Sequence, residues 1–63
     1  MILRHSLRFF ELLAAAGRPD LAAENAAVDG RFRLAVLYGR RAGLSTRRAA
    51  KLAWSLYRQE QSA

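Results

Sequence analysis

Residues 35–54 read AVLYGRRAGLSTRRAAKLAW, and this stretch decides the fold. Gly43 stands where a helix would end with a left-handed residue, and Ser45 is a favoured N-cap for a following helix. Leu44 precedes that cap and is placed to pack against Ala49 as a hydrophobic staple. The stretch therefore predicts a helix, a short turn and a second helix.

Glycines also mark the expected helix ends elsewhere in the chain. Gly17, Gly30 and Gly43 are spaced evenly, and neither a β-type alternation nor an Asn-Gly hairpin signal occurs between them. We therefore expect an all-α fold, a small bundle of about four short helices forming a single helical domain over 1–63. The expected helices run from about Leu3 to Ala16, from Pro19 to about Val28, from about Arg31 to Ala42, and from a cap at Ser45 to about Glu60.

The first and third of these helices carry most of the large apolar side chains. The third is apolar nearly all round, so we expect it to be the central helix of the core. Gly39 inside it lowers helix stability by about 1 kcal/mol relative to alanine, and a close crossing with another helix would explain its presence. The apolar face of the first helix is about twice as wide as the ~100° apolar stripe of an ordinary surface helix. We therefore expect part of it to form a dimer interface, built from Leu3, Leu7, Phe9, Phe10 and Leu13.

The chain has 63 residues, no cysteine and one histidine, His5. A domain this small buries only about 60% of the surface that its unfolded chain exposes. No disulfide or thiolate metal site is possible, and one histidine cannot build a metal site alone, so we expect no metal and no cofactor. Self-association is the remaining source of stability, which predicts a homodimer. The lack of cysteine fits a reducing compartment and predicts a cytoplasmic protein.

Positive charge is concentrated in the second half of the chain. Residues 1–30 hold three arginines against four acids, whereas residues 31–63 hold eight cations against Glu60 alone, and the net charge is +6. Such asymmetry predicts a polyanionic partner, either nucleic acid or an anionic membrane surface.

The last predicted helix places part of this charge on one strip. On a 100° wheel, Arg47, Lys51, Trp54 and Arg58 fall opposite an apolar face made by Ala49, Leu52 and Leu56. Cations neutralise phosphates, and an indole ring can stack on a base. We therefore assign nucleic-acid contacts to this strip and its neighbours: Arg40, Arg41, Thr46, Arg47, Arg48, Lys51, Trp54 and Arg58.

Residues 35–54 also resemble the helix-turn-helix of DNA-binding proteins. Gly39 occupies its fifth position, where a small residue is needed, and Gly43 its ninth, where the chain turns. The resemblance implies a recognition helix that begins at Ser45, with Arg47 and Lys51 reaching base edges and with Arg40, Arg41 and Arg58 on phosphates. It favours a DNA-binding regulator, and DNA over RNA, because no RNP sequence or GxxG loop is present.

Other functions compete with this interpretation. A small interaction module or inhibitor, of the phage or plasmid accessory type, would dock a helix face on an acidic host protein, with Trp54 and arginines as hot spots. A membrane-active peptide is disfavoured by the acids between residues 11 and 29, and no apolar run reaches the ~18–20 residues of a membrane span. A secretory leader is disfavoured because Glu11 interrupts a short apolar stretch. No nucleophile stands beside a base, so we expect no enzyme.

Overall fold

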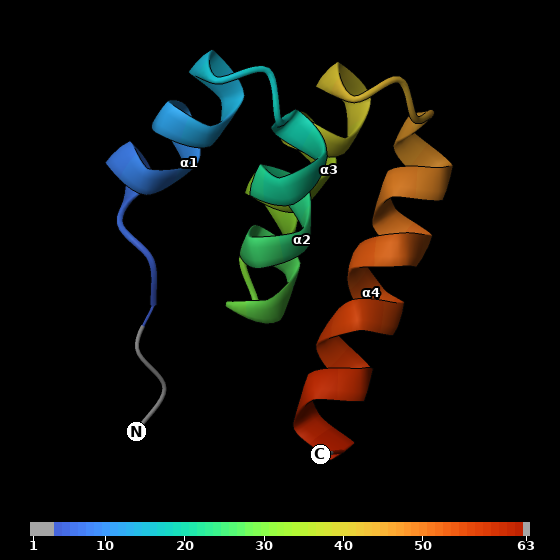
Figure 1. Cartoon of the computed structure of the whole chain (residues 1–63). Coiled ribbons are helices and arrows are strands. Elements are labelled where there is room, and N and C mark those ends of the chain that lie inside the picture. Colours follow the sequence, from blue (N-terminus) through green and yellow to red (C-terminus); the bar gives the residue numbers. More distant parts are fainter. Residues whose placement is uncertain (1–3, 63) are drawn as a thin grey trace.

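The computed structural model describes residues 4–62, which form four helices joined by short turns (Figure 1). They are α1 (Leu7–Ala15), α2 (Pro19–Val28), α3 (Phe32–Arg41) and α4 (Thr46–Ser62), and no strand occurs among these residues. The predicted all-α bundle of four helices is therefore confirmed. The part of the first predicted helix that includes Leu3 lies outside the described residues.

The three evenly spaced glycines end α1, α2 and α3 as predicted. At the turn after α2, Gly30 has φ +77°, its N–H donates to the Ala27 carbonyl, and the Arg31 N–H donates to the Ala26 carbonyl at 2.8 Å. This is the Schellman arrangement, which requires a left-handed residue and satisfies carbonyls that the helix end would leave free. The same pair of hydrogen bonds closes the turns at Gly17 and Gly43.

Serine caps set the beginnings of two helices. Ser45 Oγ accepts a hydrogen bond from the Arg48 N–H at 3.2 Å, which confirms the predicted start of α4. Ser6 is extended, with φ −74° and ψ 160°, and its Oγ accepts from the Phe9 N–H at 3.2 Å. The first helix therefore begins at Leu7, and the expected start near Leu3 is wrong because the cap at Ser6 was overlooked.

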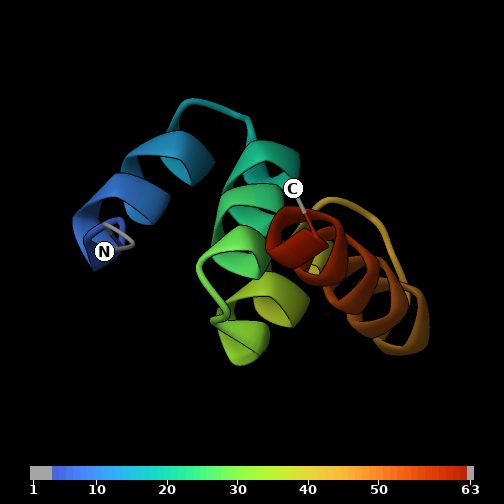
Figure 2. The same ribbon diagram turned by 90° about the horizontal axis from the view of Figure 1, so that it is seen from below.

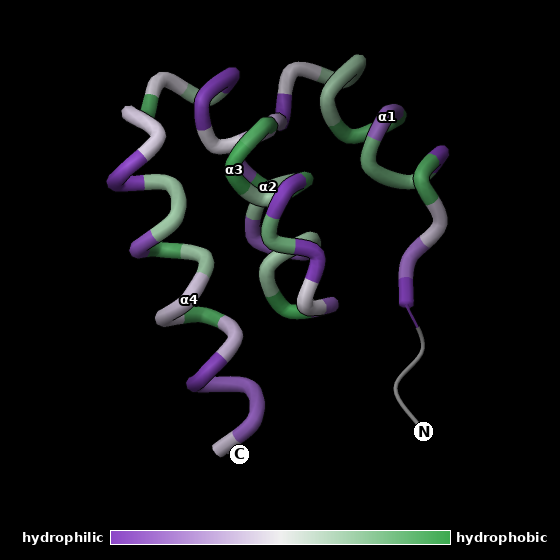
Figure 3. The backbone as a smooth tube through the Cα atoms, turned by 180° about the vertical axis from the view of Figure 1, so that it is seen from behind, coloured by the Kyte–Doolittle hydropathy of each residue, from purple (hydrophilic) through white to green (hydrophobic). Residues whose placement is uncertain are grey.

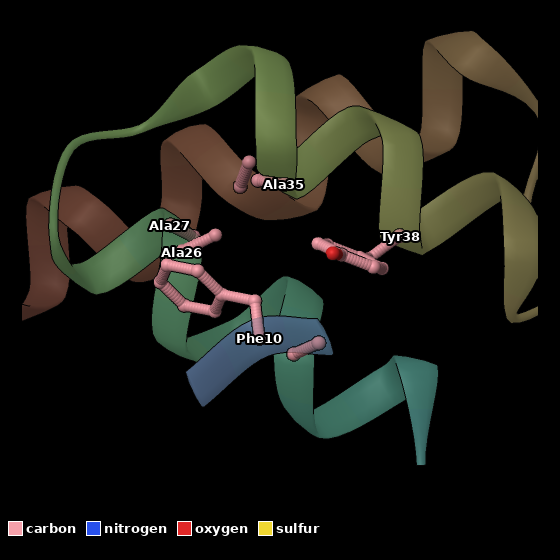
Figure 4. Packing of buried hydrophobic residues seen from close by; sticks show 7 residues of the cluster. Phe10, Ala26, Ala27, Ala35 and Tyr38 are labelled. Carbon is pink, nitrogen blue, oxygen red and sulfur yellow. The ribbon is translucent and has the colours of Figure 1, made fainter. Parts of the chain in front are cut away.

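The central helix of the bundle is α2, and the expectation that α3 would be central is wrong. Helix α2 packs against each of the other three helices (Figure 2). Its Ala22, Ala26 and Ala27 are fully buried, and Figure 4 shows the last two beside the ring of Phe10. Alanine side chains are short, so neighbouring helices can approach α2 from several directions, although each alanine buries little area.

Helices α3 and α4 approach very closely at Gly39. A Cβ atom at this position would lie 2.8 Å from Ala49 Cβ, well inside van der Waals contact. The two helices stay in contact up to the start of α3, where the Phe32 ring lies 5.3 Å from the Tyr57 ring and 5.4 Å from the Trp54 ring. The crossing expected at Gly39 is therefore present, and α3 and α4 form a hairpin along the full length of α3.

Candidate nucleic-acid interface

The strip predicted on the last helix faces solvent. Ala49 and Ala53 are buried on one side of α4, whereas Arg47, Lys51, Trp54 and Arg58 are all exposed on the other. Figure 3 shows hydrophilic and hydrophobic stretches alternating along α4 from turn to turn. The helical spacing of the sequence thus brings three cations and one indole ring to a single open side of the helix.

Helix α3 adds cations beside this strip. Arg33 and Arg40 are both exposed and lie two turns apart on one line of α3. Because Phe32 contacts Trp54 and Gly39 contacts Ala49, this line runs alongside the open side of α4. We call the combined surface the basic face; its residues are Arg33, Arg40, Arg47, Lys51, Trp54 and Arg58.

The remaining predicted contact residues lie around the basic face. Thr46 is exposed at the first position of α4. Arg41 and Arg48 are exposed but lie farther around their helices, and the Arg41 guanidinium sits 5.3 Å from the centre of the Tyr38 ring. All eight predicted contact residues are therefore accessible, although they do not share one line.

Acidic side chains do not neutralise the basic face. Within residues 4–62, one ion pair joins Arg18 to Asp20 at 3.0 Å, and His5 Nδ1 lies 2.9 Å from Asp29 Oδ2. The Arg18 hydrogen bond lowers the pKa of the Asp20 carboxyl, and Asp20 in turn raises the pKa of Arg18. Among these residues no acid pairs with an arginine of the basic face, so that face keeps its positive charge.

The Trp54 side chain is held in place by neighbouring rings, and about half of its surface is exposed to solvent. Its exposed fraction is 52%. The indole stacks on the Tyr57 ring at 5.8 Å with an interplanar angle of 19°, and it also contacts the Phe32 ring. An aromatic ring supported in this way can stack on a base or a sugar without a large loss of side-chain entropy.

Sequence reasoning missed a contact between the N-terminal segment and the turn after α2. Asp29 has a side chain only 2% exposed, and its Oδ2 accepts from the His5 backbone N–H at 2.8 Å and lies 2.9 Å from His5 Nδ1. The contact gives the one histidine of the chain a carboxylate partner. The two residues are 24 positions apart, so no local pattern could reveal the pair.

The residues assigned to a dimer interface divide into two groups. Phe10 is fully buried against the chain's own helices, and Phe9 and Leu13 are half-buried against the same core. Phe10 therefore offers no surface to a second subunit, because α2 and the Tyr38 ring already cover it. Leu7 remains 59% exposed, and Leu12, which had not been assigned, is 58% exposed.

Comparison with known proteins gives no relative. No protein family, no curated protein and no solved structure matches this chain. In the described part of the chain, no three His, Asp or Glu side chains are grouped to hold a metal ion. None of the four described helices combines the length and the apolar character needed to cross a membrane.

Proposed function

We propose that this protein is a nucleic-acid-binding protein, with DNA as its preferred ligand, and that it acts by binding rather than by catalysis. The observation that carries the proposal is the basic face, where five exposed cations surround a half-exposed tryptophan and none of the five makes an ion pair within residues 4–62. Such a surface neutralises phosphates and releases counterions, which drives binding to nucleic acid.

The roles of the side chains follow from their positions on the hairpin. Arg47 and Lys51, in the first turns of α4, reach base edges in the major groove, while Arg40, Arg41 and Arg58 bind phosphates and set the orientation. DNA is favoured over RNA because residues 35–54 resemble a helix-turn-helix, in which α4 would be the recognition helix, and only a DNA major groove is wide enough to admit one.

The protein would act as a dimeric transcription regulator in the cytoplasm. The exposed Leu7 and Leu12 of α1 support an interface with a second copy. A two-fold dimer would place two α4 helices about one DNA turn, or ~34 Å, apart on a palindromic site.

A second candidate function is binding to an acidic protein, as a small inhibitor or accessory module. The exposed apolar side chains on α1, together with Trp54 beside arginines, favour it because aromatic and arginine residues dominate interface hot spots. It differs from the first proposal in its ligand, and the same experiment separates the two.

The experiment is a fluorescence titration of Trp54, the only tryptophan of the chain, with duplex DNA, single-stranded RNA and anionic phospholipid vesicles. We expect duplex DNA to change the Trp54 emission most strongly. The double variant Arg47→Gln/Lys51→Gln should lose the response, whereas Arg18→Gln, which removes a cation already paired with Asp20, should keep it. Emission that duplex DNA leaves unchanged would contradict the proposal and favour a protein partner.

A further inference from the structure

A second arginine-lined surface lies beyond the strip on α4. A shallow, open hollow lies between the N-terminal segment and the start of α3. We call it the arginine hollow; its lining is Arg4, Leu7, Arg31, Phe32, Arg33 and Leu34. None of its arginines was among the predicted contact residues, because Arg4 meets the other two only through the fold.

Two of the three arginines of the hollow are held in place, and none of the three pairs with an acid within residues 4–62. Arg4 Nε donates to the backbone carbonyl oxygen of Asp29 at 3.2 Å, and the Arg31 guanidinium lies 5.8 Å from the centre of the Phe10 ring. Arg33 is exposed and makes neither a side-chain hydrogen bond nor an ion pair with any residue from 4 to 62. The nearby Asp29 carboxylate is bonded to His5.

The two halves of this lining match the chemistry of a nucleic-acid backbone. Guanidinium groups donate to phosphate oxygens, often in pairs, and they do so best when they are already oriented. The apolar half, formed by Leu7, Phe32 and Leu34, suits the carbon edge of a sugar next to that phosphate. We propose that the arginine hollow binds a backbone phosphate of the same nucleic acid that the basic face contacts; this inference rests on the proposed function.

A single duplex is long enough to reach both surfaces. Arg33 belongs to both surfaces, and Phe32 of the lining contacts Trp54, so the hollow adjoins the basic face. The longest dimension of the Cα trace is 29 Å, whereas a 16-base-pair duplex is about 54 Å long at ~3.4 Å per base pair. The hollow thus adds phosphate contacts at the end of the hairpin opposite the turn.

The test measures how duplex binding depends on salt. Fluorescence anisotropy of a labelled 16-base-pair duplex would be recorded with wild-type protein and with Arg4→Gln, which changes the hollow but not the basic face, over a range of KCl concentrations. Each lost phosphate contact lowers the slope of log affinity against log salt by about 0.9, so we expect a slope shallower by about one. Arg4→Gln/Arg31→Gln should lower it by about two, with helix content checked by circular dichroism because Arg4 bonds to the Asp29 carbonyl oxygen and Arg31 packs on Phe10.

Arg18→Gln is the matched control, since it removes one exposed arginine that lies at the end of α2 opposite Asp29 and is already paired with Asp20. It should leave the slope unchanged. A wild-type slope in Arg4→Gln/Arg31→Gln would overturn the hollow as a phosphate site while the proposed function stands. Wild-type protein that does not bind the duplex would overturn the proposed function and this inference together.

Discussion

Replacing Gly39 by alanine tests the close contact that joins α3 to α4. The new Cβ would lie 2.8 Å from Ala49 Cβ and 3.6 Å from Ala49 Cα. Both atoms belong to or adjoin the backbone of α4, so no side-chain rotation relieves the overlap. Carbon atoms prefer separations of about 3.5–4.0 Å, and the helices would therefore have to move apart by about 1 Å.

Two opposing effects set the size of the change. Overpacking a core contact lowers the free energy of unfolding by about 1–3 kcal/mol, whereas replacing glycine by alanine within a helix raises it by up to about 1 kcal/mol. We expect a net loss of up to about 2 kcal/mol. For a domain of this size each kcal/mol corresponds to about 4–8 °C, so Tm should fall by up to about 16 °C.

Urea unfolding followed by circular dichroism measures the free-energy change. The double variant Gly39→Ala/Ala49→Gly restores the space between the helices, so its loss should be smaller than the sum of the two single losses. A Gly39→Ala protein more stable than the wild type would refute the argument, because helix propensity alone predicts that gain.

Three further predictions follow from contacts outside the basic face. Asp29→Ala removes the buried acceptor of His5 and should lower the free energy of unfolding by about 1–3 kcal/mol; an unchanged urea midpoint would contradict this. Asp20→Asn should destabilise the protein fully above about pH 4 and progressively less below it, because the lowered pKa of Asp20 contributes stability that is present above its ordinary pKa and is lost as pH falls through the folded value. A difference between variant and wild type that persists in acid, measured by urea unfolding at several pH values, would argue against that pair. Leu7→Ser/Leu12→Ser should convert a dimer into a 7.1 kDa monomer in sedimentation velocity, and a wild type that is already monomeric at high concentration would remove the dimer prediction.

Local signals predicted the helices well, because caps and turns depend on a few adjacent residues. Gly30 and Gly43 end their helices through hydrogen bonds that span five residues, and Pro19 begins α2 at the expected position. Ser6 carried the same kind of signal, since its side chain caps α1, but the long apolar face of the first helix obscured it.

Tertiary features were harder to predict. Helix α2 gave no apolar stripe because its buried residues are alanines on several sides, and such a helix gives a weak periodic signal even though it is central. The exposure of Arg47 and Lys51 followed from helical spacing, but the meeting of Arg4 with Arg31 and Arg33 needed the contact between Asp29 and the N-terminal segment. That contact joins positions more than twenty residues apart, so no window of sequence contains it.

The salt dependence of duplex binding by the wild-type protein tests the central claim most directly, since the claim is that the cations of the α3–α4 hairpin are free to meet phosphates. With about six phosphate contacts, affinity for duplex DNA should fall roughly a thousandfold between 50 and 200 mM salt. Binding that is absent at 50 mM salt, or that keeps its strength at 200 mM, would contradict the account.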